Sequence, residues 1–482
     1  MVTLLPQMMA SLELPIDHIE QATPIISGFL AGYVVALPLL GTFSDARGRL
    51  PAYMAGLGLF GLGSLLTASA GSTPVLISGR TLQGLGGGTL VPLSLALAAD
   101  LFSGSRLTGA LGAVSGVQEA GSVLGPVWGA VLAAWLGGWQ GVFWLNLPLA
   151  AVLLVGLFLT VRRHDPPTGP GHPSGIDWAG AGMFGLALAL AVLALYPDDP
   201  SRHPLNSAAV PLGLAAAAAA AAFVWWQRRR AQPLISRKMV HSPALWASLV
   251  ANLLGGAALI IALVEVPLLG RSVYGLTTAS AGLLLTRFLL GLPVGALAGG
   301  WLAGRLGRRL TAVTGLCLAA VAYALMSTWS AQELTVSPLR AELELGLAGG
   351  GFGLVIAPLS AAAIEAAGPR QRGLGGSLVV LARTLGMVLG LAALTAYGLA
   401  RFQHIFDARA CGAPGGTSLE QQVTGLEECT KGALLQEYRE LFLIAAAVCV
   451  LAAVVVALWL RAARLPADEL SAEADRQSTA AP

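Results

Sequence analysis

Residues 117–129 read VQEAGSVLGPVWG, a run of small and apolar residues that holds one carboxylate, Glu119. Mostly apolar residues continue on both sides from position 108 to 136, which is enough to cross a bilayer, since a span needs about 20 residues. An ionisable side chain near the middle of a span costs a few kcal/mol unless it is paired or hydrated. The stretch therefore predicts a membrane-spanning helix in which Glu119 has a partner or a function.

The rest of the chain extends this pattern. Of its 482 residues 55% are hydrophobic and 11% are charged, whereas soluble domains carry about 25% charged residues. Candidate spans lie near 24–44, 50–70, 75–99, 108–136, 139–160, 177–196, 208–226, 244–270, 277–303, 310–329, 343–366, 373–400 and 438–460. Residues 1–12 look like the last half of another span. We therefore expect that the chain begins inside its first helix and that a full-length form has fourteen spans.

The basic residues give the orientation. They concentrate in alternate loops, around positions 47–49, 106, 162–163, 228–238, 305–309, 370–372 and 461–464. Loops rich in Lys and Arg stay in the cytoplasm, so we expect a multi-pass protein of the bacterial inner membrane. The net charge of +3 and the scattered basic clusters argue against binding of nucleic acid. We expect a monomer.

Three motifs occur twice at a near-constant offset. PLLGTFSDARGR (38–49) is echoed by LAGGWLAGRLGR (297–308), GGGTLVPLS (86–94) by GGFGLVIAPLS (350–360), and GSVLG (121–125) by GMVLG (386–390). Internal duplication is typical of secondary transporters, which bind substrate at the interface between the repeats.

The repeat predicts an all-α membrane protein of two pseudo-symmetric six-helix bundles with an inserted two-helix hairpin, the first helix being truncated here. The expected units are an N-terminal bundle (1–161), a linker with the hairpin (162–241), a C-terminal bundle (242–461) and a disordered cytoplasmic tail (462–482). A helical extension on the periplasmic side, about 401–437, belongs to the third unit.

The first repeated loop resembles the signature of the major facilitator superfamily. In that signature an acid such as Asp45 pairs with a neighbouring helix or arginine and holds the cytoplasmic face closed. The other reading is a solvated turn. The second copy has Gly304 in place of Asp45, so we expect an asymmetric lock. The gating residues that this resemblance indicates are Gly41, Asp45, Arg47, Gly48, Arg49, Gly307 and Arg308.

ISGRTLQGLGGG (77–88) resembles the fourth-span motif of the same superfamily. Arg80 within it either faces a cavity or partner, or snorkels to the outer boundary. GSVLGPVWG (121–129) resembles the fifth-span signature of antiporters. Its helix-packing residues are Gly121, Gly125 and Gly129, which fall on one helix face and permit close packing, and Pro126, which bends the helix.

Glu119 points away from that glycine face, toward a central cavity. Its counterpart in the repeat is Thr384, and the adjacent Arg383 lies at similar depth. We expect Glu119 and Arg383 to pair across the cavity in at least one state. A carboxylate whose cationic partner comes and goes can carry a proton. The alternative is a static ion pair between helices.

Two further charges lie in the outer half of the membrane. Glu265 sits near the outer end of one span, and Arg287 lies in the first half of the next. The two spans run antiparallel, so we expect a structural pair between these residues or a role for them in gating.

The span that begins near Gly373 continues without proline to Ala410, which at 1.5 Å per residue is roughly 57 Å of helix. CGAPGGTS then predicts a turn, and Ser418 with Gln421 predicts the start of a second helix. A disulfide between Cys411 and Cys429 is possible in the oxidising periplasm. However, a straight second helix would carry Cys429 about 16 Å from the turn, which is too far.

WQGVFWLNLPL (139–149) resembles the sixth-span pattern of fourteen-span drug:proton antiporters, with Gln140 at the usual arginine position. The hairpin, the long extension and the motifs together look closest to mycobacterial-type exporters of triacylglycerides, which work with a periplasmic lipoprotein. That resemblance also implies a charge at the outer boundary, Arg401. Those exporters have an acidic residue in a first helix that this sequence does not include.

The resemblance implies a proton-coupled exporter of lipids or other hydrophobic compounds, driven by the proton gradient and needing no cofactor or metal. A broad drug:proton antiporter is the alternative. A non-transporting membrane sensor or scaffold has no need of paired charges in the membrane. We expect no enzymatic activity, because no metal-ligand cluster and no His beside a nucleophile is visible. A periplasmic lipoprotein is the expected partner.

Overall fold

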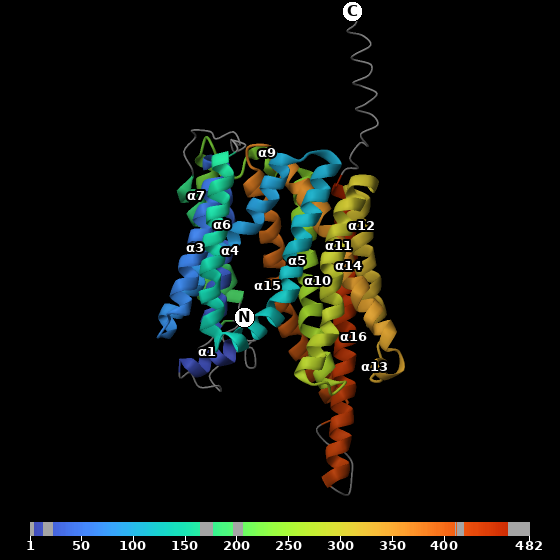
Figure 1. The fold of residues 1–482 in the computed structure, drawn as a ribbon. Helices are drawn as coiled ribbons and strands as arrows, with labels where there is room; N and C mark the ends of the chain where they lie inside the picture. Colours follow the sequence, from blue (N-terminus) through green and yellow to red (C-terminus); the bar gives the residue numbers. More distant parts are fainter. Residues whose placement is uncertain are drawn as a thin grey trace, which may run out of the picture.

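A computed structural model describes residues 4–12, 23–163, 177–195, 206–409, 411 and 419–460, and these residues form helices joined by short loops (Figure 1). The expected disordered tail, 462–482, lies outside the described residues.

The N-terminal half begins with a seven-residue helix that packs across the outer ends of the following helices. Leu4, Met8 and Met9 join a buried cluster with Ala133 and Phe143, at the outer ends of two later helices. The helices of this half are α1 (Leu5–Ser11), α2 (Thr23–Arg47), α3 (Arg49–Ala68), α4 (Thr73–Leu101), α5 (Gly104–Trp135) and α6 (Trp139–Arg163).

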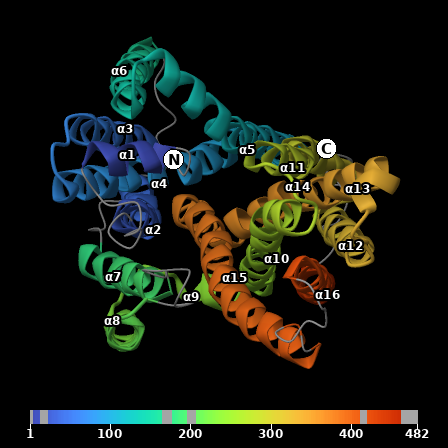
Figure 2. The same ribbon diagram turned by 90° about the horizontal axis from the view of Figure 1, so that it is seen from below.

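A hairpin of α7 (Trp178–Leu195) and α8 (Ala209–Arg229) follows, and the short α9 (Arg237–Val240) leads into the second half. The hairpin lies outside both bundles, beside α2 and α15, as Figure 2 shows. Asp177 ties its two helices together, because its carboxylate accepts hydrogen bonds from the Gly180 amide and from the side chains of Trp226 and Gln227.

The C-terminal half repeats the packing of the first. Its helices are α10 (Pro243–Ser272), α11 (Thr278–Leu306), α12 (Arg308–Met326), α13 (Glu333–Val336), α14 (Pro338–Ala367), α15 (Arg372–Ala408) and α16 (Leu419–Trp459). Helix α2 packs on α4, α3 on α4 and α3 on α6; likewise α11 packs on α14, α12 on α14 and α12 on α16. The contacts that join the halves also correspond, since α5 packs on α11 and α15 packs on α2.

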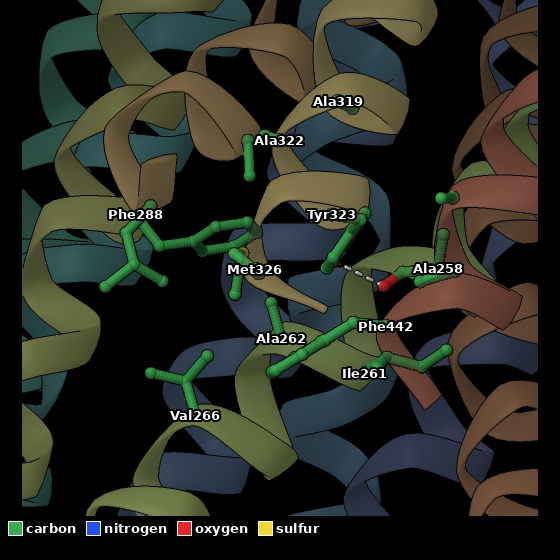
Figure 3. Packing of buried hydrophobic residues seen from close by; sticks show 14 of the residues in the cluster. Ala258, Ile261, Ala262, Val266, Phe288, Ala319, Ala322, Tyr323, Met326 and Phe442 are labelled. Carbon is green, nitrogen blue, oxygen red and sulfur yellow. Dashed lines mark hydrogen bonds between the residues drawn. The ribbon is translucent and has the colours of Figure 1, made fainter. Parts of the chain in front are cut away.

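All thirteen predicted spans are helices, and within the described residues twelve of them are long and apolar enough to cross a membrane; α5 is the remaining one. An aromatic core fixes the second half (Figure 3). Tyr323 is fully buried, donates a hydrogen bond of 2.7 Å to the Ala258 carbonyl, and stacks on Phe442. Because Tyr323, Ala258 and Phe442 come from three helices, this core holds α10, α12 and α16 together.

Helices α15 and α16 are longer than a bilayer requires, at 37 and 41 residues. At 1.5 Å per residue they reach about 55 and 61 Å, and α16 extends past the outer ends of the other helices (Figure 1). The prediction of an unusually long helix from Gly373 is confirmed within one or two residues at each end.

Candidate functional site

A cavity of about 240 Å³ lies between the two halves. The N-terminal half contributes Phe29, Leu30, Tyr33, Leu95, Ser115, Gln118 and Ser122, and the C-terminal half contributes Asn252, Ile356, Ser360, Val379, Val380, Arg383, Thr384 and Met387. We call it the central cavity. Its wall is mixed: seven of these side chains are apolar, and the other eight carry hydroxyl, amide, phenol or guanidinium groups. It can therefore hold a molecule that has both an apolar part and polar groups.

Glu119 and Arg383 meet beside the central cavity. Arg383 Nη2 donates to Glu119 Oε1 at 2.5 Å, and the two side chains are 19% and 3% exposed, respectively. Glu119 lies midway along α5 and Arg383 lies on α15, so this ion pair joins the two halves within the membrane. A close approach of α10 fixes the arginine, because a Cβ atom on Gly256 would collide with the Arg383 carbonyl oxygen.

The cytoplasmic end is closed by Asp45. Its carboxylate accepts hydrogen bonds from the amides of Gly373 (2.8 Å) and Leu374 (2.9 Å) at the start of α15, and from Arg49 (2.6 Å). A carboxylate at a helix N-terminus is stabilised by unpaired N–H groups and the helix dipole. Asp45 therefore binds the second half to the first.

Asp100 adds a second bond between the halves. It accepts from Arg49 at 2.7 Å and from Arg372, on the other half, at 2.9 Å. Sequence reasoning missed both Asp100 and Arg372. The repeat offers a signal, since Glu365 stands within one residue of the matching position and binds Arg308.

The remaining members of the loop motif have separate structural places. Gly41 lies against Gly373 and Ser377 of α15, with no room for a side chain, and Arg47 is exposed at the end of α2. Gly48 and Gly307 have φ angles of 95° and 87°, a conformation that favours glycine and turns the chain between helices.

Close packing of α5 against α11 also seals the cytoplasmic half. The Cα atoms leave little room, because a Cβ atom on Gly112 would lie 2.8 Å from Gly300 Cα, and one on Gly116 would lie 2.9 Å from Leu297. Beyond this region α5 runs obliquely away from α11 toward the outer end (Figures 1 and 2). In the described structure, the packed contacts between the halves extend from the cytoplasmic end to Glu119 and Arg383, which is an outward-facing arrangement.

The predicted packing of Gly121, Gly125 and Gly129 on another helix is wrong for the described structure. A Cβ atom on any of them would meet nothing within 4 Å. At about 100° per residue this face lies roughly 200° from Glu119, which faces the other half, so the glycines point to the outer surface of α5. Pro126 lies within α5, and its side chain is outside the described residues.

Arg80 does not snorkel to the boundary. It is 4% exposed, donates to the Gln83 side chain, and lies with its guanidinium carbon 4.4 Å from the Phe29 ring centre. Cation–π contact of this kind is worth more when the cation is desolvated. Since Phe29 lines the central cavity, Arg80 sits directly behind its wall.

The expected pair between Glu265 and Arg287 does not form. Arg287 binds Glu342 at 2.9 Å, and both side chains are more than 40% exposed. Glu265 is 6% exposed and belongs to α10, which packs against α16. The partner of Arg287 is thus on α14 and not on α10.

The outer charges hold the stalk, by which we mean residues 401–408 of α15 and residues 419–437 of α16. Arg401 makes two hydrogen bonds to Glu440, of 2.6 and 2.8 Å, and Tyr397 donates to the same carboxylate. Arg401 is thus bonded within the second half. The sequence offered no signal that Glu440 is its partner.

Cys411 and Cys429 form a disulfide with a Cα–Cα distance of 5.6 Å. The expectation that a straight second helix holds the two cysteines too far apart is wrong. It assumed that Cys411 and the start of α16 lie level, whereas Cys411 meets α16 ten residues after Leu419. About 15 Å of α16 therefore extends beyond the bond. Among the described residues, no group of three His, Cys, Asp or Glu side chains is placed to hold a metal ion.

Comparisons with known proteins agree on the type of protein. The family model of the Major Facilitator Superfamily matches residues 1–391 and 274–482. The chain is 40% identical over 439 residues to a triacylglyceride transporter of Mycobacteroides abscessus, covering 88% of this chain and 84% of that protein. It is 38% identical over 495 residues to a triacylglyceride transporter of Mycobacterium tuberculosis, covering 100% and 94%.

Solved structures share the fold at low sequence identity. The human organic anion transporter MFSD10 aligns with a TM-score of 0.56 and 19% identity, covering 92% of this chain and 88% of that chain. The proton:xylose symporter XylE aligns with a TM-score of 0.56 and 13% identity, covering 92% and 89%.

Proposed function

This chain belongs to the major facilitator superfamily, a family of membrane transporters and not of enzymes, and we propose that it is a proton-coupled exporter of triacylglycerides or similar lipids. It is a multi-pass protein of the plasma membrane. The names of its relatives support lipid as the substrate class, and the mixed apolar and polar wall of the central cavity is compatible with a lipid that carries ester groups.

The pair of Glu119 and Arg383 carries the proposal of proton coupling. It is buried, it joins the two halves, and it lies between the closed cytoplasmic contacts and the open outer face. Rocking of the halves must separate or re-form it. A carboxylate that loses its cationic partner in a low-dielectric site binds a proton, and it releases the proton when the partner returns. Proton movement is in this way tied to the change of access.

A cycle follows from this linkage. In the outward-facing state the salt bridge is formed and Glu119 is charged, so a lipid can leave from the outer side. Opening of the cytoplasmic end breaks the contacts of Asp45 with α15 and moves α5 relative to α15. Protonation of Glu119 removes the cost of separating the charges.

The test is transport in proteoliposomes with an imposed pH gradient. We expect Glu119→Gln to lose gradient-driven extraction of labelled triacylglyceride by more than tenfold, because the side chain can no longer exchange a proton. The matched control is Glu342→Gln, which makes the same chemical change in the exposed pair with Arg287. Gradient-driven transport at the wild-type rate in Glu119→Gln would remove this residue from the coupling step.

The same assay separates the lipid exporter from a broad drug:proton antiporter, to which the fifth-span and sixth-span motifs are similar. Labelled triacylglyceride and a set of cationic dyes are compared under one gradient. Transport of dyes without triacylglyceride would establish the drug antiporter.

We further propose that the stalk passes the lipid to a periplasmic lipoprotein. The paired helices, bonded by the disulfide and by Arg401 with Glu440, present a rigid surface outside the bilayer. We expect that removal of residues 405–434 abolishes delivery of lipid to the lipoprotein. Gradient-driven extraction of labelled triacylglyceride in proteoliposomes should stay unchanged. An unaltered transfer to purified lipoprotein would exclude this role.

A further inference from the structure

A second cavity, of about 920 Å³, lies between the inserted hairpin and the C-terminal half. We call it the hairpin groove. Its apolar lining comes from five helices and the loop before α9: Phe184 and Leu188 of α7, Phe223 and Val224 of α8, Val240 of α9, Leu245, Trp246, Leu249, Val250 and Leu253 of α10, Leu378, Leu381, Ala382 and Leu385 of α15, and Pro233 and Ile235.

Helix α15 separates the hairpin groove from the central cavity. Leu378, Leu381 and Leu385 face the groove, whereas Val380 and Arg383 face the cavity. The groove is closed toward the membrane middle, because α10 and α15 touch there; a Cβ atom on Gly386 would collide with the Leu253 carbonyl oxygen. The hairpin groove is therefore a separate site and does not extend the transport cavity.

The cytoplasmic mouth of the groove is cationic. Arg228, at the end of α8, Arg237, at the start of α9, and His241 line it. Both arginines are exposed, and no described acidic side chain pairs with either of them. The nearby acid, Asp177, already binds Trp226 and Gln227 and lies 3.8 Å from Arg230. The mouth thus carries positive charge that the described protein does not neutralise.

The dimensions of the groove match one leaflet of a bilayer. Along α10 its lining runs from Leu245 to Leu253, which at 1.5 Å per residue is about 12 Å, against roughly 15 Å for half of the hydrocarbon core. Trp225, three residues before Arg228 on α8, and Trp246, five residues after His241, are about half exposed. Aromatic residues of this kind mark the membrane–water interface, so the cationic mouth lies where lipid headgroups lie.

We propose that the hairpin groove binds an anionic glycerophospholipid of the cytoplasmic leaflet. The phosphate sits between Arg228 and Arg237, and the acyl chains lie against Leu249, Leu253 and Leu385. Basic sites between transmembrane helices on the cytoplasmic side recognise lipid phosphates in this manner, and guanidinium groups bind phosphate with two hydrogen bonds. A neutral lipid, including a triacylglyceride, has no group for this mouth.

Thermal unfolding of the full chain, purified in detergent and stripped of lipid, provides the test. We expect cardiolipin or phosphatidylglycerol to raise the unfolding temperature by several degrees, and phosphatidylcholine and triolein to have at most a third of that effect. Glycerol phosphate, which lacks acyl chains, should give no shift. Equal shifts with anionic and neutral lipids would overturn the proposal, and a shift with glycerol phosphate alone would indicate a phosphate site without a lipid.

Two variants and their controls locate the effect. Arg228→Gln with Arg237→Gln should reduce the shift by anionic lipid at least threefold, whereas Arg305→Gln with Arg309→Gln, on the same membrane face but outside the groove, should not. Val250→Trp fills the groove, and its control Val294→Trp lies on the exposed face of α11.

Retention of anionic lipid, counted by native mass spectrometry, should fall in Val250→Trp and stay at the wild-type level in Val294→Trp. The site would be refuted if anionic lipid raised the unfolding temperature of the arginine double variant as much as that of the wild type, and Val250→Trp retained as much lipid as the wild type. A failure of coupling through Glu119 would leave this result unchanged, because the groove proposal does not depend on transport.

Discussion

The loops at 41–49 and 300–308 are two copies of one motif, yet they act on different parts of the molecule. Both contain a glycine at positive φ followed by an arginine that binds a carboxylate at the end of a later helix. In the first copy Asp45 also binds the start of α15 in the other half. In the second copy Gly304 takes that place, and a Cβ atom there would lie 3.1 Å from Ser105 of α5.

The difference shows how one repeated loop can provide two kinds of contact. Charged hydrogen bonds hold the first contact, and close packing of small residues holds the second. A charged contact is lost in one step when its geometry changes, whereas packed helices can tilt while they stay in touch. We therefore expect the first copy to release and the second to act as a pivot when the cytoplasmic side opens.

The two glycine motifs differ in a similar way. In α15, Gly386 and Gly390 lie against the backbone of α10, the first helix of the C-terminal half. Their counterparts in α5, Gly121 and Gly125, meet nothing within 4 Å in the described structure. In the N-terminal half the described residues ahead of α2 form only the short α1. A face of glycines permits a close contact, but the contact forms only where another helix packs on that face, as α10 does on α15.

The largest effect is expected from Gly386→Leu compared with Gly121→Leu. A side chain at position 386 collides with the backbone of α10. Overpacking typically costs about 1–3 kcal/mol, and we expect a clash with backbone to lie at the upper end or above. We expect little folded Gly386→Leu protein and a near wild-type yield of Gly121→Leu, measured by size-exclusion chromatography and thermal unfolding. Equal losses in the two variants would mean that both glycine faces are packed.

The next effect concerns Asp45→Ala compared with Gly304→Asp. Loss of Asp45 removes two hydrogen bonds to amides and one to an arginine, each worth about 1.5–3 kcal/mol when a charge is involved. We expect the outward-facing population to fall at least tenfold in Asp45→Ala. We expect a smaller fall in Gly304→Asp, which crowds Ser105 but removes no charged hydrogen bond.

The readout is labelling of Ser122→Cys, which lines the central cavity, by a membrane-impermeant maleimide added from outside. Each variant is compared with Ser122→Cys alone. Unchanged labelling in Asp45→Ala together with reduced labelling in Gly304→Asp would reverse the roles assigned to the two loops.

The smallest effect separates Asp100→Asn from Glu365→Gln. Asp100 is 13% exposed and binds arginines from both halves, whereas Glu365 is 48% exposed and binds only within its own half. Exposed ion pairs contribute about 0–1 kcal/mol. We expect Asp100→Asn to reduce maleimide labelling of Ser122→Cys severalfold. We expect Glu365→Gln to change the unfolding temperature by at most about two degrees. A larger effect of Glu365→Gln on labelling would contradict the comparison.

Much of the fold follows from the sequence, because hydropathy and the repeat fix the helices and their partners. The thirteen spans, the hairpin without a counterpart and the long helix from Gly373 all follow from local composition. The depths of Glu119 and Arg383 also follow from span boundaries, and the structure places these side chains in contact.

The remaining features depend on the rotation and level of whole helices, which residue spacing does not determine. Glu265 and Arg287 lie on consecutive helices, yet Arg287 binds Glu342 of α14 while Glu265 is buried. Cys411 reaches Cys429 because it lies beside the tenth residue of α16 after Leu419 and not beside the start of that helix. Residue spacing alone does not give this offset between the two helices. Arg80 is buried behind Phe29 rather than exposed, which depends on how α2 packs on α4.

The length of α15 has a mechanical consequence. About 38 Å of continuous helix separates Arg383 from Ala408, at 1.5 Å per residue. The disulfide and the bonds of Arg401 fasten this rod to α16, so a tilt at its inner end is transmitted outward and not lost by bending. By simple trigonometry, a tilt of about 10° at Arg383 would swing the far end by roughly 7 Å on that arm. A small tilt of α15 at the central ion pair is thus expected to produce a larger displacement of the stalk outside the bilayer.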